Sequence, residues 1–148
     1  MAGLPALRRA GHAKLGGAKA HPFKLRARMP VKIVPMIHVP DVSATAEWYT
    51  SIGFELVRQN VENGKTNWAL LKLGESEIML NCGGQPSAAH RREFDLYIHI
   101  DQVDHLFAQL KDKAQTVEPP HDTFYGIREF IIRDNNGFWI TFGQPIES

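Results

Sequence analysis

The chain repeats one short sequence plan, and this repeat constrains the fold more than any other feature. The segment Ile37 to Val42 is echoed 61 residues later by the segment Ile98 to Val103. The apolar residues that follow also recur, with Val42, Ala46 and Tyr49 matched by Val103, Phe107 and Leu110. Each copy predicts a strand followed by a helix. Because one such unit cannot bury its apolar face alone, two copies are expected to complete each other in one fold.

Each copy is predicted to begin with a strand and a helix. Val31 to Val39 is rich in Val and Ile and ends at Pro40, which is typical of a buried strand. Asp41 is placed to cap the first helix, and Gly53 is placed to end it. In the second copy, Glu93 to Ile100 alternates as a strand, and a helical stripe follows on Val103, Leu106, Phe107 and Leu110.

Three short strands are predicted after each helix. In the first half they are Phe54 to Gln59, Thr66 to Leu73 and Glu77 to Asn81, separated by turns at 62–65 and 74–76. In the second half they are Thr116 to Glu118, Ile127 to Arg133 and Phe138 to Gly143, with a Pro-Pro-His-Asp loop and a turn at 134–137 between them. The order β-α-β-β-β, twice over, predicts an α+β fold in which two curved mixed sheets pair around a cleft.

The length of 148 residues fits one domain, predicted as residues 31–148 with halves 31–82 and 93–146 joined by a linker at 82–92. Residues 1–30 contain seven of the 17 Lys and Arg residues and no acid, which predicts a basic disordered extension. A transit peptide and a translation start at Met29 are the other interpretations of this segment.

The charge of the remaining residues limits the partners. They carry ten basic and 16 acidic side chains, a net charge of about −6. This acidity disfavours nucleic acid. It is interpreted either as favouring a cationic small molecule or as a charge that simply keeps the protein in solution. Cys82 is the single cysteine, so an internal disulfide and a multi-cysteine zinc site are excluded. No secretory signal or run of about 18 apolar residues is present, and we predict a cytoplasmic protein with no membrane partner.

Three stretches carry a resemblance to a known family. They are Val39 to Val42 with the following Glu47-Trp48-Tyr49 and Gly53-Phe54-Glu55, then Tyr125 to Phe130, and then Arg133 to Gly137 leading into Phe138 to Gly143. These stretches resemble the vicinal oxygen chelate superfamily of glyoxalase I, extradiol dioxygenases, fosfomycin-modifying enzymes and bleomycin-resistance proteins. The resemblance covers residues 31–146.

The resemblance bears on metal binding. Enzymes of this superfamily hold a divalent metal with His, Gln or Glu on the strands that face the cleft. Aligned by the same motifs, those positions fall at Val34, Met79, Asp95 and Thr141, and only Asp95 offers a strong donor. The resemblance therefore implies a cleft without a metal, and we predict no cofactor. The repeat-related His38 and His99 are predicted to be strand-end histidines.

The resemblance to bleomycin-resistance proteins also implies a set of ligand-binding aromatic residues. In that group the flat aromatic part of the drug lies between aromatic side chains from both subunits of a dimer, and the matching positions here are Trp68, Tyr97 and Tyr125. The other interpretation of Trp68 and Tyr97 is packing within the sheet, which is the usual role of an aromatic residue in a strand.

Three more residues complete the predicted ligand-binding site. Trp139 shares strand parity with Thr141 and is expected to face the cleft, whereas Phe138, Ile140 and Phe142 should face the helix. Asp95 is predicted either to meet a ligand cation or to form a hydrogen bond. Arg128 is predicted to bond to a neighbouring carboxylate or loop, with ligand contact as the alternative.

The function predicted from this resemblance is metal-free binding of a small molecule, as in the bleomycin-resistance type, with the ligand sequestered in a homodimer groove without turnover. No catalytic residue is assigned, because the sequence has no phosphate loop or nucleophile elbow. The alternatives are a metal-dependent enzyme of the glyoxalase, fosfomycin-modifying or dioxygenase kind, and a structural or regulatory dimer with an unused cleft.

Overall fold

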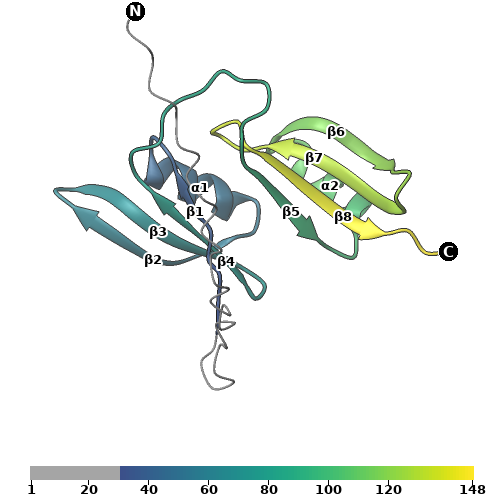
Figure 1. Cartoon of the computed structure of the whole chain (residues 1–148), viewed down its shortest axis with the longest axis horizontal. Coiled ribbons are helices and arrows are strands. Elements are labelled where there is room, and N and C mark those ends of the chain that lie inside the picture. The colour runs from purple at the N-terminus through teal and green to yellow at the C-terminus, as the bar shows by residue number, and fades with distance from the viewer. Residues whose placement is uncertain (1–30) are drawn as a thin grey trace, which may run out of the picture. The chain divides into compact units, whose positions relative to one another are not determined.

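The computed structural model describes residues 31–148, and residues 33–148 form one compact unit (Figure 1). The extension predicted for residues 1–30 lies outside the described residues. The first half contains β1 (Met36–His38), α1 (Val42–Ser51), β2 (Glu55–Glu62), β3 (Lys65–Leu73) and β4 (Ser76–Asn81). The second contains β5 (Asp95–His99), α2 (Val103–Leu110), β6 (Gln115–Asp122), β7 (Ile127–Arg133) and β8 (Trp139–Pro145). The predicted order of two β-α-β-β-β units is confirmed.

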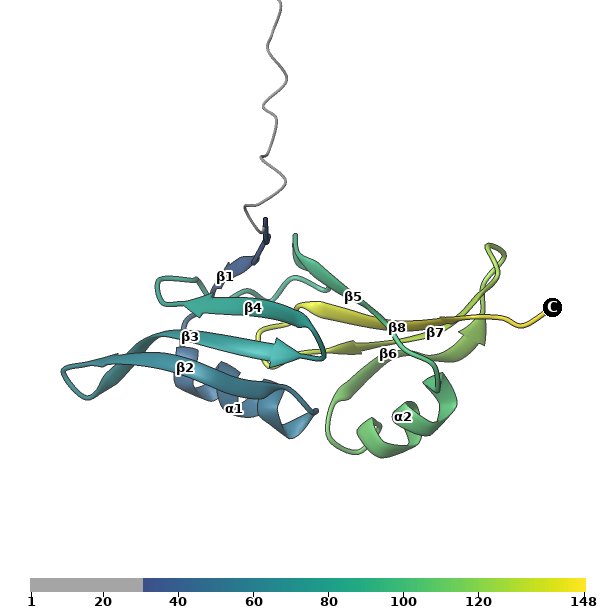
Figure 2. The same ribbon diagram turned by 90° about the horizontal axis from the view of Figure 1, so that it is seen from below.

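The strands form two four-stranded sheets, one from each half. Their orders are β1-β4-β3-β2 and β5-β8-β7-β6. Strand β1 runs parallel to β4, and β5 runs parallel to β8, whereas all other neighbouring strands are antiparallel. Figure 2 shows each helix against one face of its own sheet. The α+β class and the mixed sheets therefore follow the sequence prediction. Neither helix within residues 31–148 is long and apolar enough to cross a membrane.

The strand register relates the two halves residue by residue. Met36 on β1 pairs with Met79 on β4, and Tyr97 on β5 pairs with Thr141 on β8. Since Met36 and Tyr97 are 61 residues apart, the repeat matches Met79 with Thr141. The same register places His38 and His99 at the last positions of β1 and β5, as predicted.

Helix α1 forms where the sequence places it. The Asp41 side chain accepts a hydrogen bond from the Ala44 amide at 2.9 Å, which confirms the predicted N-terminal cap. Tyr49 is buried on the face toward the sheet. Gly53 follows with a φ of +114°, a conformation that L side chains rarely adopt, and this explains why the helix ends there.

A buried polar joint connects α1 with the turn before β8. The Tyr49 hydroxyl donates to Asp134 Oδ2 at 2.7 Å, and the Asn136 amide group donates to Thr45 Oγ1 at 2.9 Å. The other oxygen of Asp134 accepts from the backbone amides of Asn136 and Phe138 at 2.8 and 2.9 Å. A single aspartate therefore organises the turn and holds the first half to the second.

Two predicted boundaries were wrong. The first strand covers only Met36–His38, because β4 pairs with it only there; Pro35 offers no backbone N–H, and Ile33 is 88% exposed. Pro119 and Pro120 lie within β6 and not in a loop. Strand β6 is at the edge of its sheet, where a missing N–H costs no ladder bond, and its pairing is interrupted between Glu118 and His121.

Candidate functional site

A cleft of about 590 Å³ lies on the face of the second sheet opposite α2. Strands β5 to β8, the linker end at Arg91 and the loop from Thr123 to Tyr125 all line it. Four of the predicted site residues are brought together there, namely Asp95, Tyr97, Tyr125 and Trp139. They come from two strands and a loop that are far apart in the sequence, and the sheet alone makes them neighbours.

Alternation along β8 decides which side chains face the cleft. Trp139 and Thr141 line it, whereas Phe138, Ile140 and Phe142 are at most 3% exposed and belong to the core on the helix side. This confirms the orientation predicted from strand parity.

The cleft contains a buried carboxylate that sequence analysis did not assign. Glu129 on β7 is only 6% exposed, and its two oxygens accept hydrogen bonds from the hydroxyls of Tyr97 at 2.9 Å and Tyr125 at 2.7 Å. His121 Nε2 lies 4.0 Å from Glu129 Oε1. The sequence does contain a signal for this position. Adjacent strand residues point to opposite faces, so if Arg128 bonds to a carboxylate away from the cleft, as predicted, Glu129 must face the cleft.

Tyr97 reaches Glu129 by crossing β8 at Gly143. A Cβ atom built on Gly143 would lie 2.5 Å from the Tyr97 hydroxyl oxygen and 3.1 Å from Cζ. The absence of a side chain at Gly143 is therefore what leaves room for the phenol ring between β5 and β7.

The hydroxyl pKa values of these tyrosines reflect the carboxylate. Burial and the hydrogen bond to Glu129, together with its negative charge, raise the pKa of Tyr97 to about 12. The hydrogen bond to Glu129 is also the main reason why the pKa of Tyr125 is raised. Burial raises the pKa of Tyr49 well above its usual value, and the nearby Asp134 adds to this. Every tyrosine of the chain thus donates to a carboxylate.

Titration of tyrosinate absorbance tests this arrangement. The folded protein should show little tyrosine ionisation at pH 10, the ordinary pKa of the side chain, and chain denatured in guanidinium is the control. Because the pKa of Tyr97 is raised by folding, its contribution to stability is complete below pH 10 and is lost as the pH rises toward 12. Glu129→Gln should shift two of the three transitions downward and leave that of Tyr49. Full ionisation near pH 10 in the folded protein would contradict the network.

At the other end of the cleft a cation already covers an aromatic ring. The Arg91 guanidinium forms an ion pair with Asp95 and lies 4.5 Å from the centre of the Trp139 ring. The Trp139 indole N–H donates to the His90 carbonyl at 3.2 Å. Asp95 is thus hydrogen-bonded within the protein, which is one of the two alternatives predicted for it.

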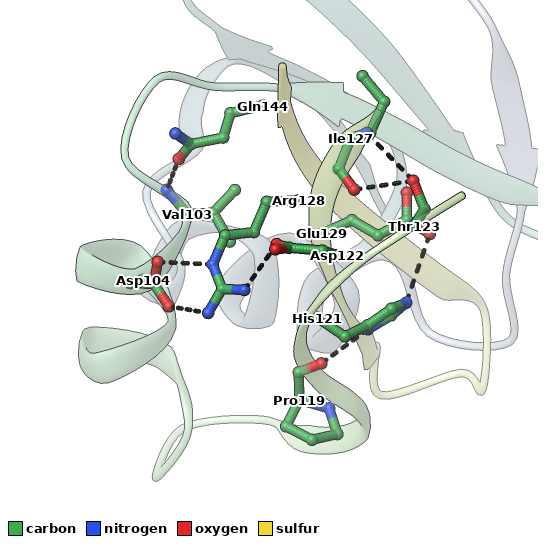
Figure 3. A network of polar contacts seen from close by, with 10 residues as sticks. All are labelled: Val103, Asp104, Pro119, His121, Asp122, Thr123, Ile127, Arg128, Glu129 and Gln144. Carbon is green, nitrogen blue, oxygen red and sulfur yellow. Dashed lines mark hydrogen bonds and ion pairs between the residues drawn. The ribbon is translucent and has the colours of Figure 1, made fainter. Parts of the chain in front are cut away.

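Two predicted site residues do not line this cleft. Arg128 donates to both oxygens of Asp104 on α2 and to Asp122 on β6, each at 2.8 Å, as Figure 3 shows. This is the carboxylate bonding predicted for Arg128, and not a position in the cleft. Trp68 lies on β3 of the first sheet, between Asn60 and Asn81 in the strand register.

The residues at the family's metal positions do not fit a divalent ion. The register confirms that Met79 and Thr141 occupy equivalent places, and neither a thioether nor a lone hydroxyl is a good donor for such an ion. Val34 has no donor, and Asp95 is paired with Arg91. Within residues 31–148 no group of three or more His, Cys, Asp or Glu side chains is placed to hold a metal.

Comparisons with known proteins agree with the fold. Residues 33–142 match the model of the Glyoxalase/Bleomycin resistance protein/Dioxygenase superfamily. A search of curated protein sequences found no match. Among solved structures, TioX from Micromonospora sp. ML1 is 21% identical with a TM-score of 0.66, over 79% of this chain and 100% of that one.

Two further similar structures are those of a bleomycin-binding protein and of a bleomycin resistance determinant. A bleomycin-binding protein complexed with bleomycin is 17% identical with a TM-score of 0.61, over 78% of this chain and 98% of that one. A bleomycin resistance determinant encoded on the transposon Tn5 is 18% identical with a TM-score of 0.62, over the same shares. At these identities the similarity establishes the fold.

Proposed function

Because the chain belongs to the Glyoxalase/Bleomycin resistance protein/Dioxygenase superfamily, we propose that it binds a small molecule in the manner of the bleomycin-resistance type, without turnover and without a metal. The observation that carries the proposal is the cleft on the second sheet, where Tyr97 and Tyr125 hold the carboxylate of Glu129 and Trp139 lines the other end. Such a cleft offers aromatic rings that can stack on a ligand and a carboxylate that can accept hydrogen bonds from it.

The exposure of the aromatic rings supports a binding role. Tyr97 is 46% exposed and Tyr125 is 53% exposed, while Phe124 beside them is fully exposed. Large rings kept at the surface of a cleft are typical of a site that a ligand covers, because covering them removes apolar surface from water. Offset stacking of a flat ligand on such rings adds about 0.5–1.5 kcal/mol for each ring pair.

The absence of turnover is proposed from the donor chemistry. Val, Met and Thr stand where the superfamily's enzymes place metal ligands, and sequestration needs affinity but no activated water or metal. A stoichiometric divalent ion in protein purified without chelator, whose removal abolishes a catalysed reaction, would instead support a metal-dependent enzyme.

The proposal includes a homodimer in the cytoplasm. Trp68 does not line the cleft of its own chain, so an aromatic groove that combines it with Tyr97 and Tyr125 requires a second subunit. Strand β2 also leaves a sheet edge with Leu56, Val57 and Val61 exposed, which a partner would cover.

Calorimetric titration with bleomycin, metal-free and copper-loaded, tests the binding function. Trp68→Ala and Tyr125→Ala should each weaken binding about 5- to 150-fold, because each removes a stacking ring. Ile33→Ala, an exposed apolar position outside both the cleft and the edge of β2, is the matched control and should bind as the unaltered protein does. Sedimentation of each variant checks that the dimer persists. Equal affinity in all four proteins would eliminate the aromatic groove.

A further inference from the structure

Resting on the proposed binding function, we infer that Glu129 recognises a planar cationic group of the ligand, such as an amidinium or guanidinium. In this arrangement Tyr97 and Tyr125 hold the carboxylate in position and present their ring faces to the flat group beside the cation. The inference goes beyond binding in general, because it names the chemical class of the ligand and the residue that selects it.

The charge of Glu129 lacks a permanent counter-ion. Burying a carboxylate is costly unless it is paired and hydrogen-bonded. Its two hydrogen-bond donors are neutral phenols, and within residues 31–148 the nearest group that can become cationic is His121, at 4.0 Å. The adjacent Arg128 is turned away toward Asp104 and Asp122. A ligand cation would supply the missing charge.

The tautomer of His121 also bears on the missing counter-ion of Glu129. Its Nδ1 lies 2.9 Å from the Pro119 carbonyl oxygen, which only accepts, so Nδ1 carries the hydrogen. In the neutral ring Nε2 then presents a lone pair toward Glu118 at 3.4 Å and Glu129 at 4.0 Å. In that tautomer His121 donates its ring hydrogen to Pro119 and not to Glu129.

The other carboxylates of the cleft are occupied or solvated. Asp95 pairs with Arg91, and Asp122 pairs with Arg128. The Glu118 side chain is 50% exposed, and the charge of so exposed a group is screened by water. Glu129 is thus the buried acid of this cleft that is left for a ligand.

The fold itself does not require an acid at this position. Trp68 pairs with Asn81 on β4, and Glu129 pairs with Gly143 on β8, at matching places in the two sheets. The repeat therefore puts a tryptophan in the first half where the second half has Glu129. The architecture accepts an aromatic side chain at this position, so the fold by itself does not account for the charge of Glu129.

The hydrogen-bond capacity of Glu129 matches a forked donor. A carboxylate offers about four acceptor positions, and the two tyrosine hydroxyls use one on each oxygen. One acceptor position on each oxygen remains, which suits the two parallel N–H groups of an amidinium or guanidinium. A single ammonium fills this pattern less well.

The matched pair of benzamidine and benzamide tests the inference, because the two probes have nearly the same shape and differ in charge. The unaltered protein, titrated by NMR, should prefer benzamidine. Glu129→Gln should lower benzamidine affinity about 10- to 100-fold and leave benzamide affinity within about twofold. Glu118→Gln, which removes an exposed acid from the same cleft, should change the preference less than about threefold.

A second measurement needs no variant. Bound benzamidine in the unaltered protein should give nuclear Overhauser contacts to the ring protons of Tyr97 and Tyr125. Contacts to Trp139 alone would overturn the inference, as would an unchanged preference in Glu129→Gln. If bleomycin binds but benzamidine is not preferred over benzamide, the inference fails alone. If bleomycin also fails to bind, the proposed function fails and the inference with it.

Discussion

Replacement of Asp134 by alanine should lower the free energy of unfolding by about 3–5 kcal/mol, measured by urea denaturation. The side chain is buried and accepts hydrogen bonds from the Tyr49 hydroxyl and from the amides of Asn136 and Phe138. Alanine would leave these three donors without their acceptor, and each orphaned buried donor costs about 1–3 kcal/mol. The loss also releases the turn that precedes β8 and with it the joint to α1.

The asparagine variant separates hydrogen bonding from charge. In Asp134→Asn, the amide oxygen can still accept from Asn136 and Phe138, so the loss should stay below about 2 kcal/mol. Burial raises the pKa of Asp134 while its hydrogen bonds oppose the change, so removal of the charge also removes a desolvation cost. Tyr49→Phe completes a double-mutant cycle with Asp134→Ala. Additive effects in that cycle would show that the Tyr49 hydroxyl and Asp134 do not act together.

The repeat made the fold predictable from sequence. Both helices, both sheets and the turn at Asp134 follow from a period-2 pattern, a 3.6-residue pattern and turn residues that occur twice. The errors lie where tertiary context overrides local chemistry. Pro119 and Pro120 predict a loop by propensity, but at a sheet edge they remain within β6.

The candidate site was predictable only in part. Strand parity was sufficient to place Trp139 in the cleft, because one register decides a whole strand. It could not show that Tyr97 crosses β8 to meet Glu129, since that contact depends on the missing side chain of Gly143. Nor could it show that Arg91 folds back over Trp139, because linker residues follow no periodic pattern.

The two halves share a backbone plan but differ in the chemistry of the equivalent sheet face. In the first half, Met36, Met79 and Trp68 occupy the positions that Tyr97, Thr141 and Glu129 occupy in the second. At these three positions the first half has apolar side chains, whereas the second half has polar side chains that include a carboxylate. A flat cationic ligand needs both kinds of surface, which is consistent with a groove built from one face of each kind.

Replacement of Phe130 by alanine should lower the free energy of unfolding by about 3–5 kcal/mol, whereas Glu129→Gln, one residue earlier on β7, should cost less than about 1.5 kcal/mol. Phe130 is fully buried on the helix side, where its ring stacks on Phe142 with centroids 5.0 Å apart and lies 5.2 Å from the ring of Phe107. Truncation of this ring leaves a cavity in the core.

The comparison within one strand separates stability from recognition. Glu129 faces the cleft, so its isosteric amide should keep the fold and lose the preference for cationic ligands, while Phe130→Ala should lose stability. Thermal or urea unfolding of the two variants, followed by benzamidine titration of whichever remains folded, gives both readings. Equal destabilisation by the two substitutions would show that Glu129 is retained to hold the sheet together, because a group kept for its charge toward a ligand contributes little to folding by itself.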